Sequence, residues 1–269
     1  MRSLRATFWI GVYFLLVFSP FIILLVGPRP AGREFWREFS VALGYAGLSL
    51  TGFQFIPTAR LPFLSDVFPM DTLYLFHHRI SLASLYLVLA HPIILFINNP
   101  FTLRLLNLVT APGRARAGVL AVLAMIILVV TSARRKELEI QYEHWRAAHI
   151  IFSVVAAAMA LVHIFGVRYH TANPMQRALW IAMPALWLLM VIYVRGIRTI
   201  MLLRRPYQIV EVRPERGDSW TLALQPLNHP GMRFVPGQVA WLTVQRIPAA
   251  IREHPFSFSS SAERTDRRD

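Results

Sequence analysis

Six long apolar runs dominate this sequence of 269 residues. A membrane-spanning helix needs about 20 mostly apolar residues, because the hydrocarbon layer of a bilayer is about 30 Å thick. The runs cover residues 8–27, 39–57, 73–97, 118–132, 147–167 and 178–194. The first run also resembles a signal peptide, but it is too long for one and no small-residue cleavage motif precedes Gly27. The pattern therefore predicts an all-α bundle of six membrane-spanning helices.

The composition supports a membrane protein and excludes several kinds of site. Hydrophobic residues make up 55% of the chain and charged residues only 16%. The net charge of +14 comes from arginines that mostly flank the apolar runs, where they anchor helices at the lipid interface, so we expect membrane lipid and no nucleic acid as a partner. Because the chain has no cysteine, it has no disulfide, no cysteine-ligated iron–sulfur cluster and no covalently attached haem.

Two of the apolar runs carry histidines at matched spacing. His78 and His91 lie in the third run, and His149 and His163 lie in the fifth. At 1.5 Å per residue, each pair spans about 20 Å. Ionisable residues inside a membrane span are costly and indicate a functional site. Two imidazoles at each of two depths fit two haems better than zinc, which takes three or four protein ligands at one depth.

The phase of the third helix leaves a choice between two adjacent histidines. At about 100° per residue, a step of 14 residues returns to nearly the same helix face, whereas a step of 13 ends about 140° away. His77 is therefore in phase with His91, and His78 is in phase only if the helix is distorted, for which Pro92 offers a cause.

These residues resemble the ferric reductase and NADPH oxidase superfamily of transmembrane bis-haem proteins. In that family the third and fifth helices each supply two histidines. The first histidine of the third helix often belongs to a His-Arg dipeptide, here His78-Arg79. The first histidine of the fifth helix typically lies a few residues after a Trp, as His149 lies after Trp145. The resemblance selects His78 over His77. The ligands that it implies for two b-type haems are His78, His91, His149 and His163.

The character of the chain changes after residue 205. Short alternating segments at 207–212, 220–224 and 238–244 are separated by Pro, Gly, Asp and Asn, which is typical of antiparallel strands. Residues 213–218 predict a hairpin turn. We therefore expect two domains: the bundle in residues 1–205 and a partial antiparallel β-barrel in residues 206–269.

Two segments of the second domain resemble the flavin-binding barrel of the ferredoxin-reductase-like family. They are Phe-Val-Pro-Gly-Gln at 234–238 and His-Pro-Phe-Ser-Phe-Ser-Ser-Ser at 254–261. The resemblance implies that Phe256 stacks on the flavin ring of FAD, that Ser257 bonds to it, and that His254 and Ser260 meet the pyrophosphate. The FAD-binding residues that it implies are His254, Pro255, Phe256, Ser257 and Ser260.

The resemblance also implies an oxidoreductase. Electrons would pass from NAD(P)H to FAD, then through two haems to a ferric chelate or, as second choice, to dioxygen. The chain ends soon after the flavin motif, so we expect weak FAD retention and either a fragment or a separate reductase or nucleotide-binding domain as partner.

Two alternatives remain open at this point: a haem-binding subunit that serves a separate reductase, and an ion or metal transporter with histidines in its spans. Basic residues are slightly more numerous on the N-terminal side of the predicted spans. By the positive-inside rule, this favours an orientation with the N-terminus and the FAD domain in the cytoplasm. We expect the membrane to be the inner membrane of a bacterium.

Overall fold

The computed structural model describes residues 2–27, 30–59, 61–234, 238–244 and 254–260. The chain divides into two compact units between Met190 and Val191. The first unit holds the long helices and the second holds the strands, the first of which begins at Tyr207, one residue after the change in character at 206. We describe each unit by itself.

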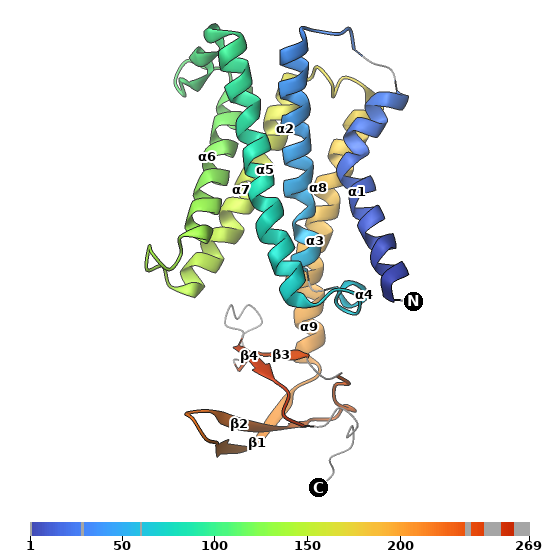
Figure 1. The fold of residues 1–269 in the computed structure, drawn as a ribbon, viewed down its shortest axis with the longest axis vertical. Helices are drawn as coiled ribbons and strands as arrows, with labels where there is room; N and C mark the ends of the chain where they lie inside the picture. Colours follow the sequence, from blue (N-terminus) through green and yellow to red (C-terminus); the bar gives the residue numbers. More distant parts are fainter. Residues whose placement is uncertain (1, 28–29, 60, 235–237, 245–253, 261–269) are drawn as a thin grey trace. The chain divides into compact units, whose positions relative to one another are not determined.

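The first unit is a bundle of six long helices (Figure 1), each long and apolar enough to cross a membrane, as the sequence predicted. They are α1 (Arg2–Val26), α2 (Phe35–Phe53), α5 (Met70–Asn98), α6 (Gly113–Ala133), α7 (Tyr142–Val167) and α8 (Pro174–Ile192). Short turns α3 (Phe55–Thr58) and α4 (Pro62–Ser65) connect α2 to α5, and the 3-10 turn η1 (Pro100–Leu106) follows α5. All six helices begin earlier than the apolar runs, because their first turns contain polar residues.

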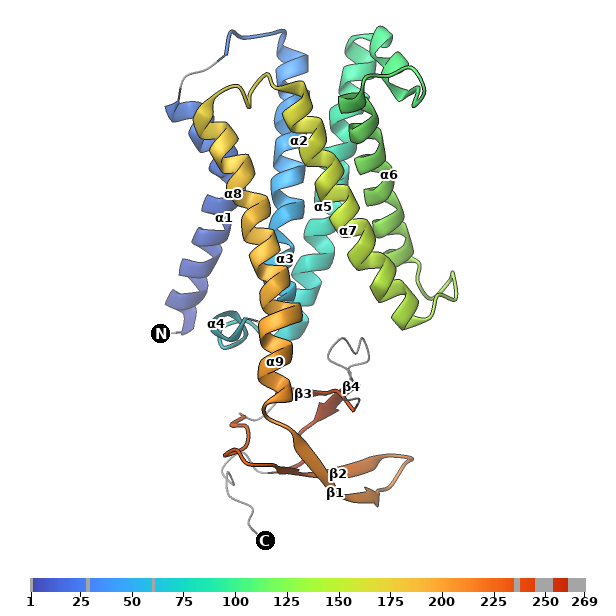
Figure 2. The same cartoon turned by 180° about the vertical axis from the view of Figure 1, so that it is seen from behind.

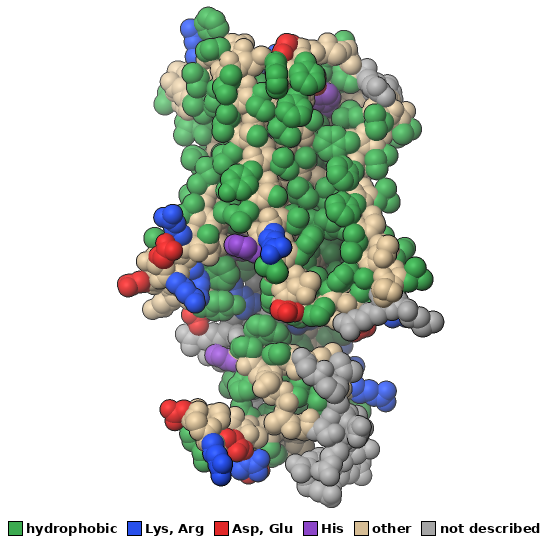
Figure 3. All heavy atoms as spheres, viewed as in Figure 1, with side chains coloured by type: hydrophobic (Ala, Val, Ile, Leu, Met, Phe, Trp, Pro, Cys, Tyr) green, Lys and Arg blue, Asp and Glu red, His purple; other side chains and the backbone are tan. Residues whose placement is uncertain are grey.

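The outside of the bundle is apolar. Large hydrophobic side chains such as Phe14, Ile151 and Leu188 are more than half exposed. Figure 3 shows a nearly continuous hydrophobic surface over one side of the helices, with charged side chains gathered toward their ends. So much exposed apolar surface is unfavourable in water and is what lipid requires. The chain is thus a multi-pass integral membrane protein.

Four of the six long helices form two closely packed pairs. Helix α2 packs along α5, and α6 packs along α7 (Figures 1 and 2). A separate buried cluster, which includes Tyr45, Phe53, Trp180 and Trp187, joins α2 to α8. Helices α5 and α7 therefore belong to different pairs.

The second unit contains the π-turn η2 (Tyr193–Ile197), the short helix α9 (Arg198–Leu203) and four strands. Strand β1 (Tyr207–Pro214) pairs with β2 (Trp220–Pro226), and β3 (Val239–Leu242) pairs with β4 (His254–Ser257), both antiparallel. The three predicted strands are confirmed, and the predicted turn between β1 and β2 contains Gly217 and Asp218 at positive φ. In the described residues the strands form two separate sheets, which constitute the predicted partial β domain.

Candidate metal centres

Helices α5 and α7 face each other through two pairs of histidines. The ring centres of His77 and His149 are 6.2 Å apart, and those of His91 and His163 are 6.3 Å apart. The earlier histidine of α5 meets the earlier histidine of α7, so these two helices run in the same direction. We call the two places the His77 site and the His91 site.

The structure corrects one residue of the sequence-based pairing. His78 was expected opposite His149, but its side chain is exposed, and His77 takes that position. The reason is the helical phase: α5 is one continuous α-helix from Met70 to Asn98, although it contains Pro92. His77 and His91, which are 14 residues apart and therefore in phase, both face histidines of α7.

Three of the four paired imidazoles are held through the same ring nitrogen. His91 Nδ1 lies 2.9 Å from the Ser40 carbonyl oxygen, and His163 Nδ1 lies 2.8 Å from that of Arg114. A carbonyl oxygen only accepts, so each Nδ1 carries a proton, and in the neutral imidazole Nε2 then keeps its lone pair. This is the tautomer of a metal-binding histidine, whose second nitrogen is fixed by an oxygen acceptor.

His149 reaches the same state through a hydroxyl. Its Nδ1 lies 3.0 Å from Ser132 Oγ. That hydroxyl donates to the Leu128 carbonyl at 2.6 Å and accepts from Trp145 Nε1 at 3.2 Å. Because the hydroxyl donates its only proton to Leu128, it accepts a hydrogen bond from His149 Nδ1. In the neutral imidazole the Nε2 atom of His149 then keeps its lone pair. His77 differs, since its Nδ1 is buried without a hydrogen-bond partner among the residues described.

Two glycines give the rings of the His91 site their space. A Cβ atom added to Gly44 of α2 would lie 3.2 Å from His91 Cγ, and one added to Gly118 of α6 would lie 2.8 Å from His163 Nδ1. The second distance is shorter than non-bonded contacts allow, so any larger residue at 118 would displace the imidazole.

A cavity of about 800 Å³ adjoins the His91 site. It is bordered by α2, α5, α6 and α7, and its lining is mostly apolar apart from a basic end that includes Arg33, Arg37 and Arg114. Cavities of about 300–1,000 Å³ with apolar walls and a few polar groups are typical of cofactor sites. Within the described part of the chain, no three His, Cys, Asp or Glu residues cluster closely enough to hold a metal ion.

His170 also borders this cavity. Its side chain is only 12% exposed, and Nε2 lies 3.1 Å from Glu38 Oε2. Burial lowers the pKa of His170 below its ordinary value, and the Glu38 carboxylate acts in the opposite direction.

Comparison with known proteins assigns the centre of this bundle. Residues 43–160 match the family model of the ferric reductase like transmembrane component. These residues are a ferric reductase-like transmembrane domain. The matched range includes the histidines at 77, 91 and 149, and His163 follows three residues beyond it. The family indicates an oxidoreductase and electron transfer across the membrane. No curated protein matches the chain.

Beyond the ferric reductase-like domain, the residues expected to bind FAD lie on and just after β4. Phe256 is half-buried and pairs in register with Ala240, whereas His254, Pro255, Ser257 and Ser260 are exposed. The two motif segments meet, because the rings of Phe234 and Phe258 stack with their centres 4.0 Å apart. Residues 235–237 and 261 of these segments lie outside the described residues.

Several residues around the ferric reductase-like site escaped the sequence analysis. Ser132, Gly44 and Gly118 act on the histidines from α2 and α6, far away in sequence, so no local spacing points to them. His77 could have been predicted from the sequence, because His77 is in phase with His91 on the helix and His78 is not.

Proposed function

We propose that the bundle carries electrons across a membrane through two b-type haems, one at the His77 site and one at the His91 site. The observation that supports this most directly is the spacing of the rings. A bond between a metal and an imidazole nitrogen is about 2.0–2.1 Å, and that nitrogen lies about 1.1 Å from its ring centre, so two imidazoles on opposite sides of one metal have ring centres about 6.2–6.4 Å apart. The pairs are separated by 6.2 and 6.3 Å.

The chain's own groups prepare these positions. The Nδ1–H groups of His91, His149 and His163 are held by oxygen acceptors, so their Nε2 lone pairs are available without deprotonation. The 14-residue steps along α5 and α7 set the two sites about 21 Å apart along the helices. A haem bound by two histidines supplies reversible one-electron chemistry at each depth. The cavity beside the His91 site has mostly apolar walls, which disfavour ions and water next to them.

On this proposal, electrons come from NAD(P)H by way of FAD on the cytoplasmic side, and the His91 site delivers them on the opposite side. FAD supplies the conversion of a two-electron donor into one-electron steps. Phe256 would stack on the flavin ring, and Ser257 would form a hydrogen bond with it. His254 and Ser260 would contact the pyrophosphate of FAD, and Pro255 would belong to the same binding segment. A separate reductase or nucleotide-binding domain is the proposed partner, and a ferric chelate is preferred over dioxygen as acceptor.

The test is the visible spectrum and haem content of the purified chain in lipid nanodiscs. We expect a low-spin b-type spectrum upon reduction with dithionite and two haems per chain by the pyridine haemochrome assay. His149→Ala and His163→Ala should each remove one haem, whereas the exposed His144 of α7 provides a control, His144→Ala, that should keep both. A chain without haem absorbance would instead support a transporter with intramembrane histidines.

A further inference from the structure

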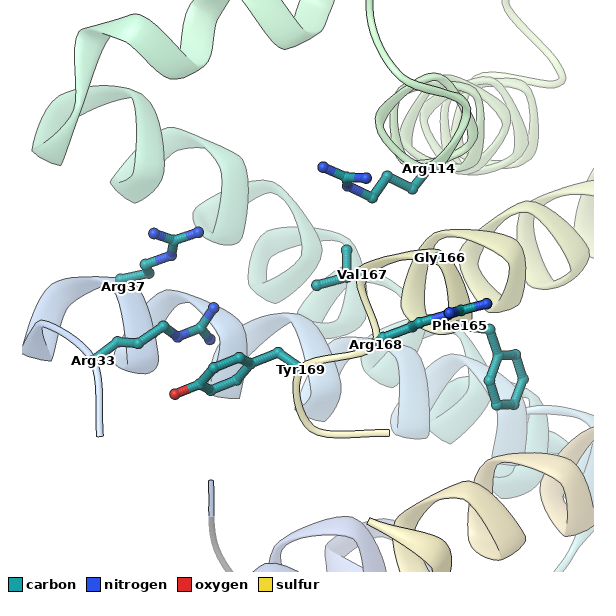
Figure 4. Close-up of a pocket in the computed structure, with 8 residues that line it drawn as sticks. All are labelled: Arg33, Arg37, Arg114, Phe165, Gly166, Val167, Arg168 and Tyr169. Atoms are coloured by element: carbon teal, nitrogen blue, oxygen red, sulfur yellow. The ribbon is translucent and has the colours of Figure 1, made fainter. Parts of the chain in front are cut away.

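A second cavity, of about 640 Å³, opens at the end of the bundle that carries the His91 site. Four arginines line it, Arg33, Arg37, Arg114 and Arg168, and we call it the arginine chamber. The first three also line the cavity of the His91 site. In Figure 4, Arg37 and Arg114 extend toward each other from opposite sides of the opening, Arg33 lies over Tyr169, and Arg168 extends away from the other three.

The chain segments at this end have a large excess of positive charge. Residues 28–40, 97–118 and 166–178 contain eight arginines and two acidic residues, Glu34 and Glu38. Hydrogen bonds from the backbone N–H groups of Trp36 and Arg37 and from Asn98 Nδ2 occupy Glu34 and lower its pKa. Glu38 pairs with Arg33 and contacts His170. Both carboxylates thus already have hydrogen-bond or ion-pair partners.

Arg37 and Arg114 have no carboxylate partner among the residues that the structure describes. Arg33, by contrast, is held by Glu38 and lies 3.7 Å from the centre of the Tyr169 ring. Both side chains are exposed, and two guanidinium groups that extend toward one opening can bind an anion there through charge-assisted hydrogen bonds.

The same two arginines belong to the turns that hold the histidine rings. The Arg114 carbonyl accepts a hydrogen bond from His163 Nδ1. The Arg37 carbonyl accepts one from the Ser40 hydroxyl, and the Ser40 carbonyl in turn accepts one from His91 Nδ1. Backbone that is fixed by these bonds positions both guanidinium groups next to the His91 site. An anion in the chamber would therefore lie close to the place where electrons leave the bundle.

Arg168 is the fourth arginine of the chamber and follows the last residue of α7. It ends α7 in the left-handed conformation, at φ 63°. Glycine or asparagine is the usual residue at such a position, because a longer side chain is strained there. Because its side chain extends away from the other three arginines, Arg168 borders the chamber but is not one of the proposed contacts.

We propose that the arginine chamber binds a small anion with several carboxylate groups, and that Arg37 and Arg114 are its principal contacts. This inference rests on the proposed function for its purpose: the bound anion would be the chelator of a ferric acceptor, held for reduction at the His91 site. Carboxylates are also present on haem, and the experiment separates these two sources.

The experiment measures binding of gallium(III) citrate, a redox-inert counterpart of ferric citrate, to the oxidised protein in phosphatidylcholine nanodiscs by calorimetry. Arg37→Gln and Arg114→Gln should each weaken binding by about tenfold or more, since each removes charge-assisted hydrogen bonds. Arg116→Gln is the matched control: Arg116 is exposed on the same turn of α6, carries the same charge and borders neither cavity. It should bind like the unaltered chain.

Three results would overturn the proposal. The first is no binding to the unaltered chain, and the second is equal weakening by Arg116→Gln. The third is loss of haem or a changed haem spectrum in Arg37→Gln or Arg114→Gln without citrate, which would assign these arginines to the haem carboxylates. Because gallium citrate accepts no electron, the expected binding pattern in a chain without haem would support the chamber while contradicting the proposed electron transfer.

Discussion

Trp145 and His149 donate to the same acceptor, the hydroxyl oxygen of Ser132. The serine proton is used in a bond to the Leu128 carbonyl, so the hydroxyl has no freedom to reverse either contact. The indole also packs against the imidazole, with ring centres 5.3 Å apart. One turn of α6 thereby fixes the orientation and the tautomer of the neutral imidazole of a histidine on α7.

We predict that Ser132→Ala raises the midpoint potential of the haem at the His77 site. Loss of the acceptor makes the His149 imidazole a weaker electron donor, which stabilises ferric iron less. Each tenfold change in the relative affinity for the two oxidation states corresponds to about 59 mV for one electron. Potentiometric titration of the visible spectrum measures the shift.

Ser153→Ala is the control for Ser132→Ala. Its hydroxyl bonds to the His149 carbonyl at 2.6 Å and leaves the imidazole alone. Equal shifts in both variants would show a general effect of packing and contradict a specific role of Ser132.

The two adjacent histidines of α5 give a second prediction. His77→Ala should lose one haem equivalent by the pyridine haemochrome assay, because its ring faces His149 across the bundle. His78→Ala should keep two, because His78 is exposed. The reverse result would restore the ligand implied by the family's His-Arg dipeptide.

Helix α5 shows how much of the site could be predicted from the sequence. Apolar runs determine which segments span the membrane, and those were predicted correctly because burial in lipid depends on composition over some 20 residues. The spacing of histidines within one helix also follows from its sequence. What faces that helix does not: Ser132, Gly44 and Gly118 meet the rings only after α2 and α6 have packed, and packing depends on contacts distant in sequence.

Gly118 provides the third prediction. Gly118→Ala should weaken haem binding at the His91 site selectively, since its Cβ would lie 2.8 Å from His163 Nδ1. Haem content should fall toward one per chain, and combination with His163→Ala should cause no further loss. Gly113→Ala, in the same helix, is the control, because the nearest atom to its added Cβ is 4.0 Å away. A stable Gly118→Ala variant with two haems would contradict the role of this close contact.

Phe256 tests the flavin proposal. Phe256→Ala should weaken FAD binding roughly 2- to 13-fold, the equivalent of about 0.5–1.5 kcal/mol for one aromatic stacking contact. Phe256→Tyr keeps a flat ring and should bind FAD like the unaltered chain. Quenching of FAD fluorescence upon titration with protein measures both, and equal affinities in all three proteins would exclude Phe256 from the flavin site.

The absence of cysteine makes the proposed orientation directly measurable. A single cysteine at Glu139 would report on the exposed connection between α6 and α7, and one at Thr110 on the exposed segment before α6. Arg134, Arg135 and Lys136 directly follow α6, and basic residues so close to a span favour the cytoplasm. Glu139→Cys should therefore react with a membrane-impermeant maleimide only after the cells are permeabilised, whereas Thr110→Cys should react in intact cells. The opposite labelling would invert the bundle, place the His77 site toward the outside, and require electrons to enter at the His91 site.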